Sequence, residues 1–148
     1  MAESSEVTLR LANLEDSALL LAWRNDGETR HQSISTQEIN KSEHEKWLRE
    51  SLEDAAVKLF IVISGGKSVG TVRAQKGSGA WILSWTVSPE SRGRNIGYLA
   101  VAKLIEQLCG NVQAYIKVNN LASIRIAEKL GMLCKSKDEE MTLWVLSQ

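Results

Sequence analysis

The sequence predicts a mixed α/β fold on three observations. Short runs rich in β-branched and aromatic residues indicate strands. Longer stretches in which apolar residues recur every three or four positions indicate helices. The two kinds of segment alternate as one strand, two helices, three strands, a helix, a strand, a helix and two strands. The 148 residues are enough for one domain, 1–148, with a sizeable core.

Seven segments have the character of strands. The first alternates apolar and polar residues, and Gly65 and Gly66 lie between the second and third as in a hairpin turn. Pro89 closes the fourth strand. The predicted strands are residues 7–12, 57–63, 68–75, 81–87, 112–118, 132–136 and 141–146.

The first two predicted helices begin at polar residues that are able to cap them. Asn13, with Asp16 three residues later, begins a helix that ends near residue 24. Residues 42–45 form a capping box for a second helix, whose apolar residues Trp47, Leu48 and Leu52 share one face. The polar segment between the two helices, residues 25–41, is expected to be irregular.

The other two predicted helices end at glycines. Ile96, Leu99 and Ala100 begin the apolar face of a helix that is expected to end at Gly110. The fourth helix is expected over residues 121–130, with Gly131 as its C-terminal cap.

Composition limits the classes of partner and the compartment. Eighteen basic residues balance 18 acidic ones, so no net charge favours nucleic acid or a membrane surface. The chain has no secretory signal pattern and no apolar run of membrane-spanning length, so we expect a soluble, cytoplasmic protein. Cys109 and Cys134 lack metal-ligand spacing and are expected to be reduced and buried, without a metal site. A homodimer is compatible with the sequence.

An anion site is predicted where the strand 81–87 leads into the helix that begins at Ile96. Backbone N–H groups at a helix N-terminus are unpaired and lie at the positive end of the helix dipole. Arg92 and Arg94 add charged donors for phosphate oxygens. The segment lacks the glycine-lysine signature of nucleotide hydrolases and the Gly-x-Gly-x-x-Gly dinucleotide fingerprint. A pyrophosphate site is therefore the prediction, and an ordinary turn with solvated arginines is the alternative.

Two motifs together resemble the signatures of the GNAT superfamily of acyl-CoA-dependent N-acetyltransferases. Residues 92–97 match Arg/Gln-x-x-Gly-x-Gly/Ala, except that Asn95 occupies the first glycine position. Asn120, Ser123 and the run Glu-Lys-Leu-Gly-Met over 128–132 match the second motif. The resemblance covers nearly the whole chain. It implies the GNAT fold, a mixed sheet of six to seven strands splayed between the fourth and fifth, with four helices.

The resemblance also implies how acetyl-CoA binds. Its pantetheine arm would lie between the splayed strands, against backbone groups near Thr86 and Val87, and its pyrophosphate on the N–H groups of residues 92–97. Asn95 tolerates a positive φ better than most residues and is a small departure from the motif. The implied cofactor residues are Thr86, Val87, Arg92, Gly93, Arg94, Asn95, Ile96, Gly97, Asn120 and Ser123. For Asn120, a plain helix cap is the alternative.

The two positions at which family members often carry a titrating group are apolar here. The usual glutamate of the fourth strand is Ile82, and the usual tyrosine before Glu-Lys-Leu-Gly is Ala127. Ser84, on the strand face of Ile82, is a candidate to hold a water, and Ser123 is a candidate to protonate the departing thiolate. Ser84 and Ser123 are therefore the candidate catalytic residues, and no single indispensable base is expected.

Residues 23–25 (Trp-Arg-Asn) and 43–48 (Glu-His-Glu-Lys-Trp-Leu) resemble a subgroup that acetylates amino sugars on nucleotide carriers. The subgroup implies an acceptor wall built from the first two helices. An exposed Trp23 would stack on a sugar or base, unlike most of the five tryptophans, which are expected in the core. The implied acceptor residues are Trp23, Arg24, Glu28, Arg30 and His44. The alternative is that Trp23 packs inward and Arg24 pairs with Asp26.

The predicted function is acetyl-CoA-dependent transfer of an acetyl group to a primary amine. The expected acceptor is an amino sugar on a nucleotide carrier, as used in surface-polysaccharide synthesis. Two alternatives stay open: an acetyltransferase for protein N-termini, as for ribosomal proteins, and a non-catalytic acyl-CoA-binding module.

Overall fold

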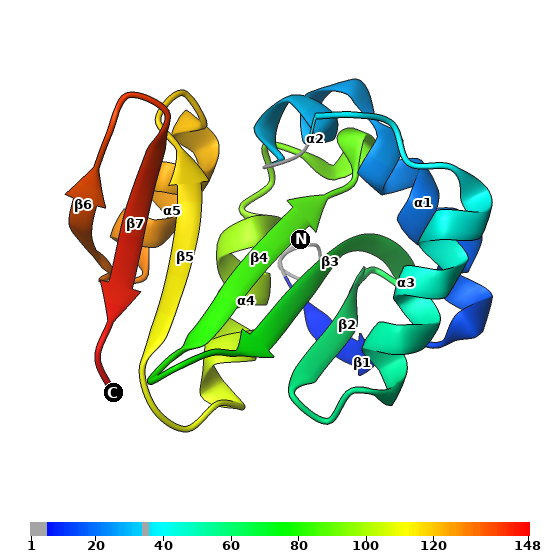
Figure 1. Cartoon of the computed structure of the whole chain (residues 1–148), viewed down its shortest axis with the longest axis horizontal. Helices are drawn as coiled ribbons and strands as arrows, with labels where there is room; N and C mark the ends of the chain where they lie inside the picture. The colour runs from blue at the N-terminus through cyan, green and yellow to red at the C-terminus, as the bar shows by residue number, and fades with distance from the viewer. Residues whose placement is uncertain (1–5, 34–35) are drawn as a thin grey trace.

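The computed structural model describes residues 6–33 and 36–148. These residues form seven strands and five α-helices (Figure 1). The strands are β1 Thr8–Leu11, β2 Val57–Ser64, β3 Lys67–Lys76, β4 Trp81–Val87, β5 Val112–Lys117, β6 Leu133–Lys137 and β7 Met141–Leu146. The helices are α1 Ser17–Asn25, α2 Gly27–Gln32, α3 Lys41–Glu53, α4 Ile96–Glu106 and α5 Leu121–Lys129. The predicted mixed α/β architecture with seven strands is confirmed.

All seven strands belong to one mixed sheet in the order β1-β2-β3-β4-β5-β7-β6. Alternate residues of β2 face opposite sides of it, as the period of a strand requires. Phe60 and Val62 pack in the cluster that includes α4, whereas Leu59 and Ile61 pack in the cluster that includes α1 and α3. The helices therefore cover both faces of the sheet.

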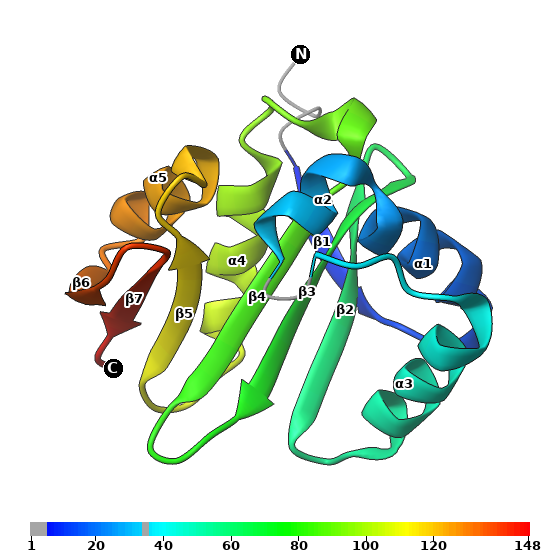
Figure 2. The ribbon, with the colours of Figure 1, turned by 45° about the horizontal axis from the view of Figure 1, so that its top comes forward.

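The sheet is splayed between its two central strands, as expected. The parallel pair β4 and β5 shares only two residue pairs, Trp81 with Val112 and Ile82 with Gln113. Beyond these pairs the two strands diverge (Figures 1 and 2). From Leu83 onward, β4 therefore presents a free backbone edge toward β5.

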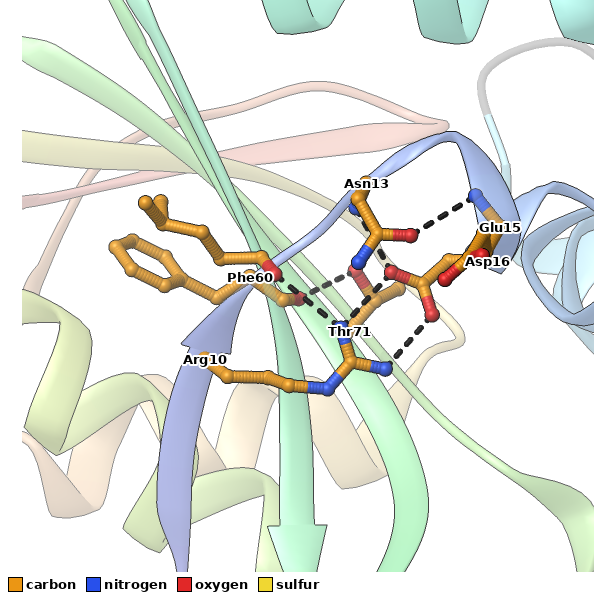
Figure 3. Close-up of polar contacts among 7 residues, drawn as sticks. Arg10, Asn13, Glu15, Asp16, Phe60 and Thr71 are labelled. Atoms are coloured by element: carbon orange, nitrogen blue, oxygen red, sulfur yellow. Dashed lines mark hydrogen bonds and ion pairs between the residues drawn. The ribbon is translucent and has the colours of Figure 1, made fainter.

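The chain leaves β1 through a capping box. The side chain of Asn13 accepts a hydrogen bond from the N–H of Glu15 at 2.8 Å, and the Asp16 carboxylate accepts one from the N–H of Asn13 at 2.8 Å (Figure 3). Arg10 of β1 donates two hydrogen bonds to the same carboxylate, at 2.9 and 2.7 Å. These bonds lower the pKa of Asp16. The predicted cap at Asn13 is confirmed, although residues 14–16 form a 3₁₀ turn before α1.

Two predictions near the acceptor-side helices were wrong. The segment expected to be irregular contains α2, because the Asp26 carboxylate caps it by accepting the N–H of Thr29 at 3.1 Å. α3 begins at Lys41, one residue before the predicted box, because Asn40 caps it by accepting the N–H of Glu43 at 2.8 Å.

Two further expectations near the chain's second half were also wrong. α4 ends at Glu106 rather than at Gly110, because Gln107 already closes the helix with hydrogen bonds to Leu104 and Ile105. Both Cys109 and Cys134 are exposed rather than buried. Cys134 lies on β6, an edge strand whose five residues are all exposed.

Within residues 6–33 and 36–148, none of the helices is both long and apolar enough to cross a bilayer.

Candidate functional site

One large cleft, with a volume of about 1290 Å³, opens at the splay of the sheet. Its walls come from the second half of β4, the middle of β5, most of the segment 91–98, α5, and parts of β3, α1, α2 and α3. α2 lies at the end of β4 where the chain enters this segment, as both views show (Figures 1 and 2). The cleft therefore joins the predicted pyrophosphate loop to the predicted acceptor wall.

Most of the predicted site residues line this cleft. The exceptions are Arg94 in the cofactor set and Arg30 in the acceptor set. Ser84 is exposed at the cleft, and the apolar residues that replace the usual titrating groups, Ile82 and Ala127, are half-buried and fully buried, respectively.

The loop before α4 has the conformation that an anion cradle needs. Asn95 has a φ of 66° and Gly93 a φ of 81°, so the expected tolerance of Asn95 for the left-handed region is confirmed. The backbone N–H groups of residues 93–98 donate no hydrogen bond to any described residue. The open N–H groups at the start of α4 therefore remain available to an anion.

A lysine that the sequence analysis missed completes this loop. Lys129 of α5 donates a hydrogen bond to the side-chain oxygen of Asn95 at 3.0 Å. Its ammonium lies 4.4 Å from the centroid of the Tyr98 ring. Lys129 thus places a positive charge beside the loop, and only the fold reveals this because Lys129 lies 34 residues after Asn95 in the chain.

The guanidinium of Arg92, predicted to bind the pyrophosphate, has partners in the protein itself. Its guanidinium pairs with the Asp26 carboxylate at 2.9 Å and donates to the Thr29 hydroxyl at 3.2 Å. The hydrogen bond from Arg92 lowers the pKa of Asp26. Because Asp26 pairs with Arg92, the alternative of an Arg24–Asp26 surface pair was wrong.

Gly97 is needed for packing between helices. A Cβ at this position would lie 2.7 Å from Cδ1 of Ile126 and 3.5 Å from Cγ2 of Val87. The side-chain direction of residue 97 therefore points to α5 and β4. Glycine lets α4 and α5 approach closely beside the splay.

Two polar groups of α5 face the splay. The Asn120 side-chain oxygen accepts the N–H of Ser123 at 3.2 Å, which makes Asn120 a helix cap and leaves its amide N–H₂ group for a ligand. The indole N–H of Trp85 donates to the Ser123 hydroxyl at 3.1 Å. The Ser123 hydroxyl proton is then free to point elsewhere, because the oxygen is the acceptor in this bond.

The expectation of an exposed Trp23 was wrong. Trp23 is 5% exposed and packs with Leu20, Leu48 and Ile61 in the cluster between α1, α3 and β2. Trp47, expected in the core, is instead 39% exposed and lines the cleft. Helical spacing could not tell the buried ring from the exposed one, because both lie on amphipathic helices.

The acceptor half of the cleft contains three cationic or titrating groups. Burial, and then the charge of Arg30, lowers the pKa of Arg24. Burial, and then the charge of Arg24, lowers the pKa of His44, so its imidazole is neutral at pH 7. His44 is 3% exposed, and its ring centroid lies 5.3 Å from that of Trp47. Arg73 of β3, which the sequence analysis missed, also lines this half.

Acidic groups lie at the rim of the same half. Glu28, Glu38 and Glu43 line the cleft and are all exposed. Glu28 accepts a hydrogen bond from the side chain of Gln32 at 3.2 Å. Among the described residues, no group of three or more His, Cys, Asp or Glu side chains is arranged to hold a metal ion.

Comparison with known proteins agrees with this architecture. The family model described as the acetyltransferase (GNAT) domain matches residues 6–133. No curated protein matches the sequence.

Three solved structures show how widely the fold is used. Aminoglycoside acetyltransferase AAC(6')-Ib in complex with coenzyme A is 20% identical, with a TM-score of 0.81 over 97% of this chain and 95% of that one. Spermidine N-acetyltransferase from Vibrio cholerae, with CoA and spermine, is 13% identical, with a TM-score of 0.88 over 97% and 96%. The ribosomal L7/L12 alpha-N-protein acetyltransferase RimL, with coenzyme A, is 11% identical, with a TM-score of 0.84 over 98% and 96%.

These likenesses show the fold, and the family model spans most of the chain. The splayed β4 and β5 and the loop before α4 are the two places where the resemblance implies that acetyl-CoA binds. The chain therefore belongs to the GNAT family of acetyl-CoA-dependent N-acetyltransferases.

Proposed function

We propose that the chain acetylates the primary amine of an amino sugar carried on a nucleotide. The observation that carries this proposal is the large cleft of about 1290 Å³, which exceeds the roughly 300–1,000 Å³ of ordinary small-ligand pockets. Such a cleft has room for the arm of acetyl-CoA and for a large acceptor at the same time.

The cofactor end of the cleft fits acetyl-CoA. The free edge of β4 near Thr86 and Val87 offers backbone donors and acceptors to the pantetheine amides. The open N–H groups of residues 93–98 suit the pyrophosphate, with Lys129 as a nearby charge. The amide of Asn120 is positioned to donate to the arm.

The acceptor end favours an anionic acceptor over a polycation. Arg24 is half-buried and lines the cleft, where its guanidinium is placed to bind a phosphate of the carrier. Glu28, Glu38 and Glu43 at the exposed rim would attract a polyamine, but the half-buried Arg24 within the cleft would repel it. The exposed ring of Trp47 replaces Trp23 as the surface on which a sugar or base would stack.

Hydroxyl groups, rather than a titrating side chain, are proposed to move the protons. Ser84 is exposed at the cleft and would hold the water that receives the amine proton. Ser123 accepts the Trp85 N–H, so its own proton would be available to the sulfur of the leaving thiolate and would be replaced by the proton that the amine releases to water. Positioning of the two reactants supplies the larger part of the rate enhancement in this scheme.

The test is release of free thiol from acetyl-CoA over a panel of amines. The panel contains nucleotide-linked amino sugars, the free sugars, peptides with free N-termini, spermidine and an aminoglycoside. The proposal expects the highest kcat/KM for a nucleotide-linked sugar. A preference for peptides would instead identify a protein N-terminal acetyltransferase, and a preference for spermidine or the aminoglycoside would contradict an anionic acceptor. Coenzyme A binding without thiol release on any amine would also contradict the proposal.

A further inference from the structure

Arg73 occupies a rigid position at the floor of the acceptor half. It lies in β3, between two fully paired neighbours, and its Cα pairs with that of Ser84 in β4. Residues directly opposite on antiparallel strands share one face of the sheet. Arg73 and Ser84 therefore face the same side of the sheet, beside the position at which the acceptor amine is expected.

The guanidinium of Arg73 has unused hydrogen-bonding capacity. Its Nε is buried and has no hydrogen-bond partner. Within the part of the chain that the structure describes, no carboxylate lies within 4.0 Å of it. Burial lowers the pKa of Arg73, and the more distant charge of Asp54 opposes this effect. A guanidinium nevertheless stays protonated, so the charge persists with its buried Nε donor unused.

An aromatic contact is the principal neighbour interaction of this charge. Cζ of Arg73 lies 5.8 Å from the centroid of the Trp47 ring. A cation over a ring face is stabilised modestly, and the ring satisfies no N–H donor. A partly buried charge whose donors lack acceptors destabilises the folded protein. A guanidinium that is held in place and lacks an acceptor is typical of a preorganised anion site without its ligand.

The topology assigns this charge to the acceptor rather than to acetyl-CoA. The splay lies between β4 and β5, whereas Arg73 lies on β3, on the other side of β4. The pyrophosphate loop has its own positive group in Lys129.

We propose that Arg73 binds an oxyanion, a phosphate or a carboxylate, that the acceptor carries beside its reacting amine. The inference rests on the proposed function in taking this half of the cleft as the acceptor site. It adds that the acceptor is recognised by an anionic group at β3, in addition to any phosphate held at Arg24. The planar fork of Arg73 suits bidentate contact with either oxyanion.

The kinetic test uses three sugars that differ in one group: glucosamine, glucosamine 6-phosphate and 2-amino-2-deoxyglucuronate. Arg73→Met removes the charge and keeps the apolar stem, and Arg73→Lys keeps the charge but loses the fork. Arg49→Gln is the matched control, because Arg49 is an exposed arginine of α3 outside the cleft. The wild type should prefer one of the anionic sugars over glucosamine, and that sugar identifies the oxyanion.

Arg73→Met should lower kcat/KM for the preferred anionic sugar by about 10- to 100-fold, the range of a lost hydrogen bond to a charged group. Its kcat/KM for glucosamine and its KM for acetyl-CoA should stay within about twofold of the wild type, since neither ligand uses the oxyanion site. Arg73→Lys should recover part of the loss, and Arg49→Gln should show none. Equal losses on all three sugars would overturn the proposal.

Two further measurements keep the proposal separate from the sugar assignment. The first is calorimetric binding of uridine diphosphate and of glucosamine 6-phosphate to protein saturated with coenzyme A, so that the loop before α4 is filled. Binding of either anion that Arg73→Met abolishes and Arg49→Gln preserves supports the anion site even if the true acceptor is not a sugar. Failure of the wild type to bind either anion, or equal binding by Arg73→Met, overturns it.

The second measurement is thermal stability. If Arg73 serves a ligand, then Arg73→Met removes a partly buried charge that has no carboxylate partner, and the Tm should stay level or rise. A purely structural stack on Trp47 predicts a lower Tm, and a clear fall in Tm together with unchanged anion binding would overturn the proposal.

Discussion

The guanidinium of Arg92 lies 2.9 Å from the carboxylate of Asp26, and this ion pair joins the cofactor loop to the first turn of α2. A second contact holds the other end of the same helix, because Lys117 at the end of β5 donates to the backbone oxygen of His31 at 2.9 Å. α2 is thus tied to the chain on both sides of the splay. The motif that predicts a phosphate contact for Arg92 also contributes to the acceptor wall.

We expect Arg92→Gln and Asp26→Asn to raise the acceptor KM by similar factors, since either change releases α2. The two effects should not add in the double variant, because both remove the same contact. The pair is partly exposed, so its loss should change stability by only about 0–1 kcal/mol. Steady-state kinetics and acetyl-CoA binding measure the outcome. If Arg92→Gln lost affinity for acetyl-CoA and Asp26→Asn did not, Arg92 would instead be a ligand of the pyrophosphate.

A second prediction concerns the close approach of α4 and α5. Gly97→Ala should lower the free energy of unfolding, because overpacking of a well-packed site typically costs about 1–3 kcal/mol. The higher helix propensity of alanine stabilises the helix by less than that cost. Ile126→Val removes Cδ1, the atom that the new methyl group would meet at 2.7 Å. In the double variant the two changes should therefore compensate. Urea unfolding of the four proteins gives the coupling, and strictly additive effects would contradict the contact.

A third prediction follows from the capping box at Asn13. The hydrogen bonds from Arg10 lower the pKa of Asp16 in the folded protein, so the unfolded chain binds more protons than the folded one in acid. The stabilisation is fully present above the unfolded pKa of about 3.9 and is lost as the pH falls through the lower folded value. Asp16→Asn should destabilise the protein at pH 7 by about 1–2 kcal/mol, from the cap and a partly exposed ion pair together.

The measurement is urea unfolding of wild type and Asp16→Asn from pH 7 downward. The difference between the two proteins should narrow with acid. Glu15→Gln is the control, since the Glu15 side chain is exposed and lies outside the Arg10 contact. A difference that stays constant down to the lowest pH at which the proteins fold would contradict the linkage.

A fourth prediction concerns proton movement. Ala variants of Ser84, Ser123, His31 and His44 should each lower kcat by less than about 100-fold, because the loss of a true general catalyst typically costs 10²–10⁴-fold. Trp85→Phe keeps an aromatic ring, although a smaller one, and loses the N–H bond, so it should resemble Ser123→Ala and not add to it. The rate should rise with pH as the acceptor amine deprotonates. One variant without turnover but with acetyl-CoA still bound would reveal an indispensable catalyst.

The features that the sequence predicts best are those that neighbouring residues determine. The seven strands follow from local patterning, and the conformation of Asn95 follows from its residue type in a known motif. α2 was missed because its cap, Asp26, is a single residue in a polar segment without apolar periodicity.

The side-chain partners across the cleft depend on distance in space. Asp26 is 66 residues from Arg92, and no local pattern links them. Arg73 reads as the polar face of a strand, which is usually solvated; the fold turns that face toward α3 and Trp47 instead. Whether a helix covers one face of a strand depends on the tertiary structure. That cover decides which arginines lie in the site.

Only two residue pairs connect the strands β1–β4 to the strands β5–β7 within the sheet. The junction is therefore a weak line in the sheet. In the free protein, the packing of α4 against residues of β4 and β5 holds its two sides together. A ligand arm lodged along β4 would extend the hydrogen-bonded lattice across this line, as an added strand does. Beyond Ile82, the amides of β4 that point toward β5 rather than β3 should then exchange quickly in the free protein and slowly with coenzyme A bound, so the cosubstrate serves as a removable part of the sheet.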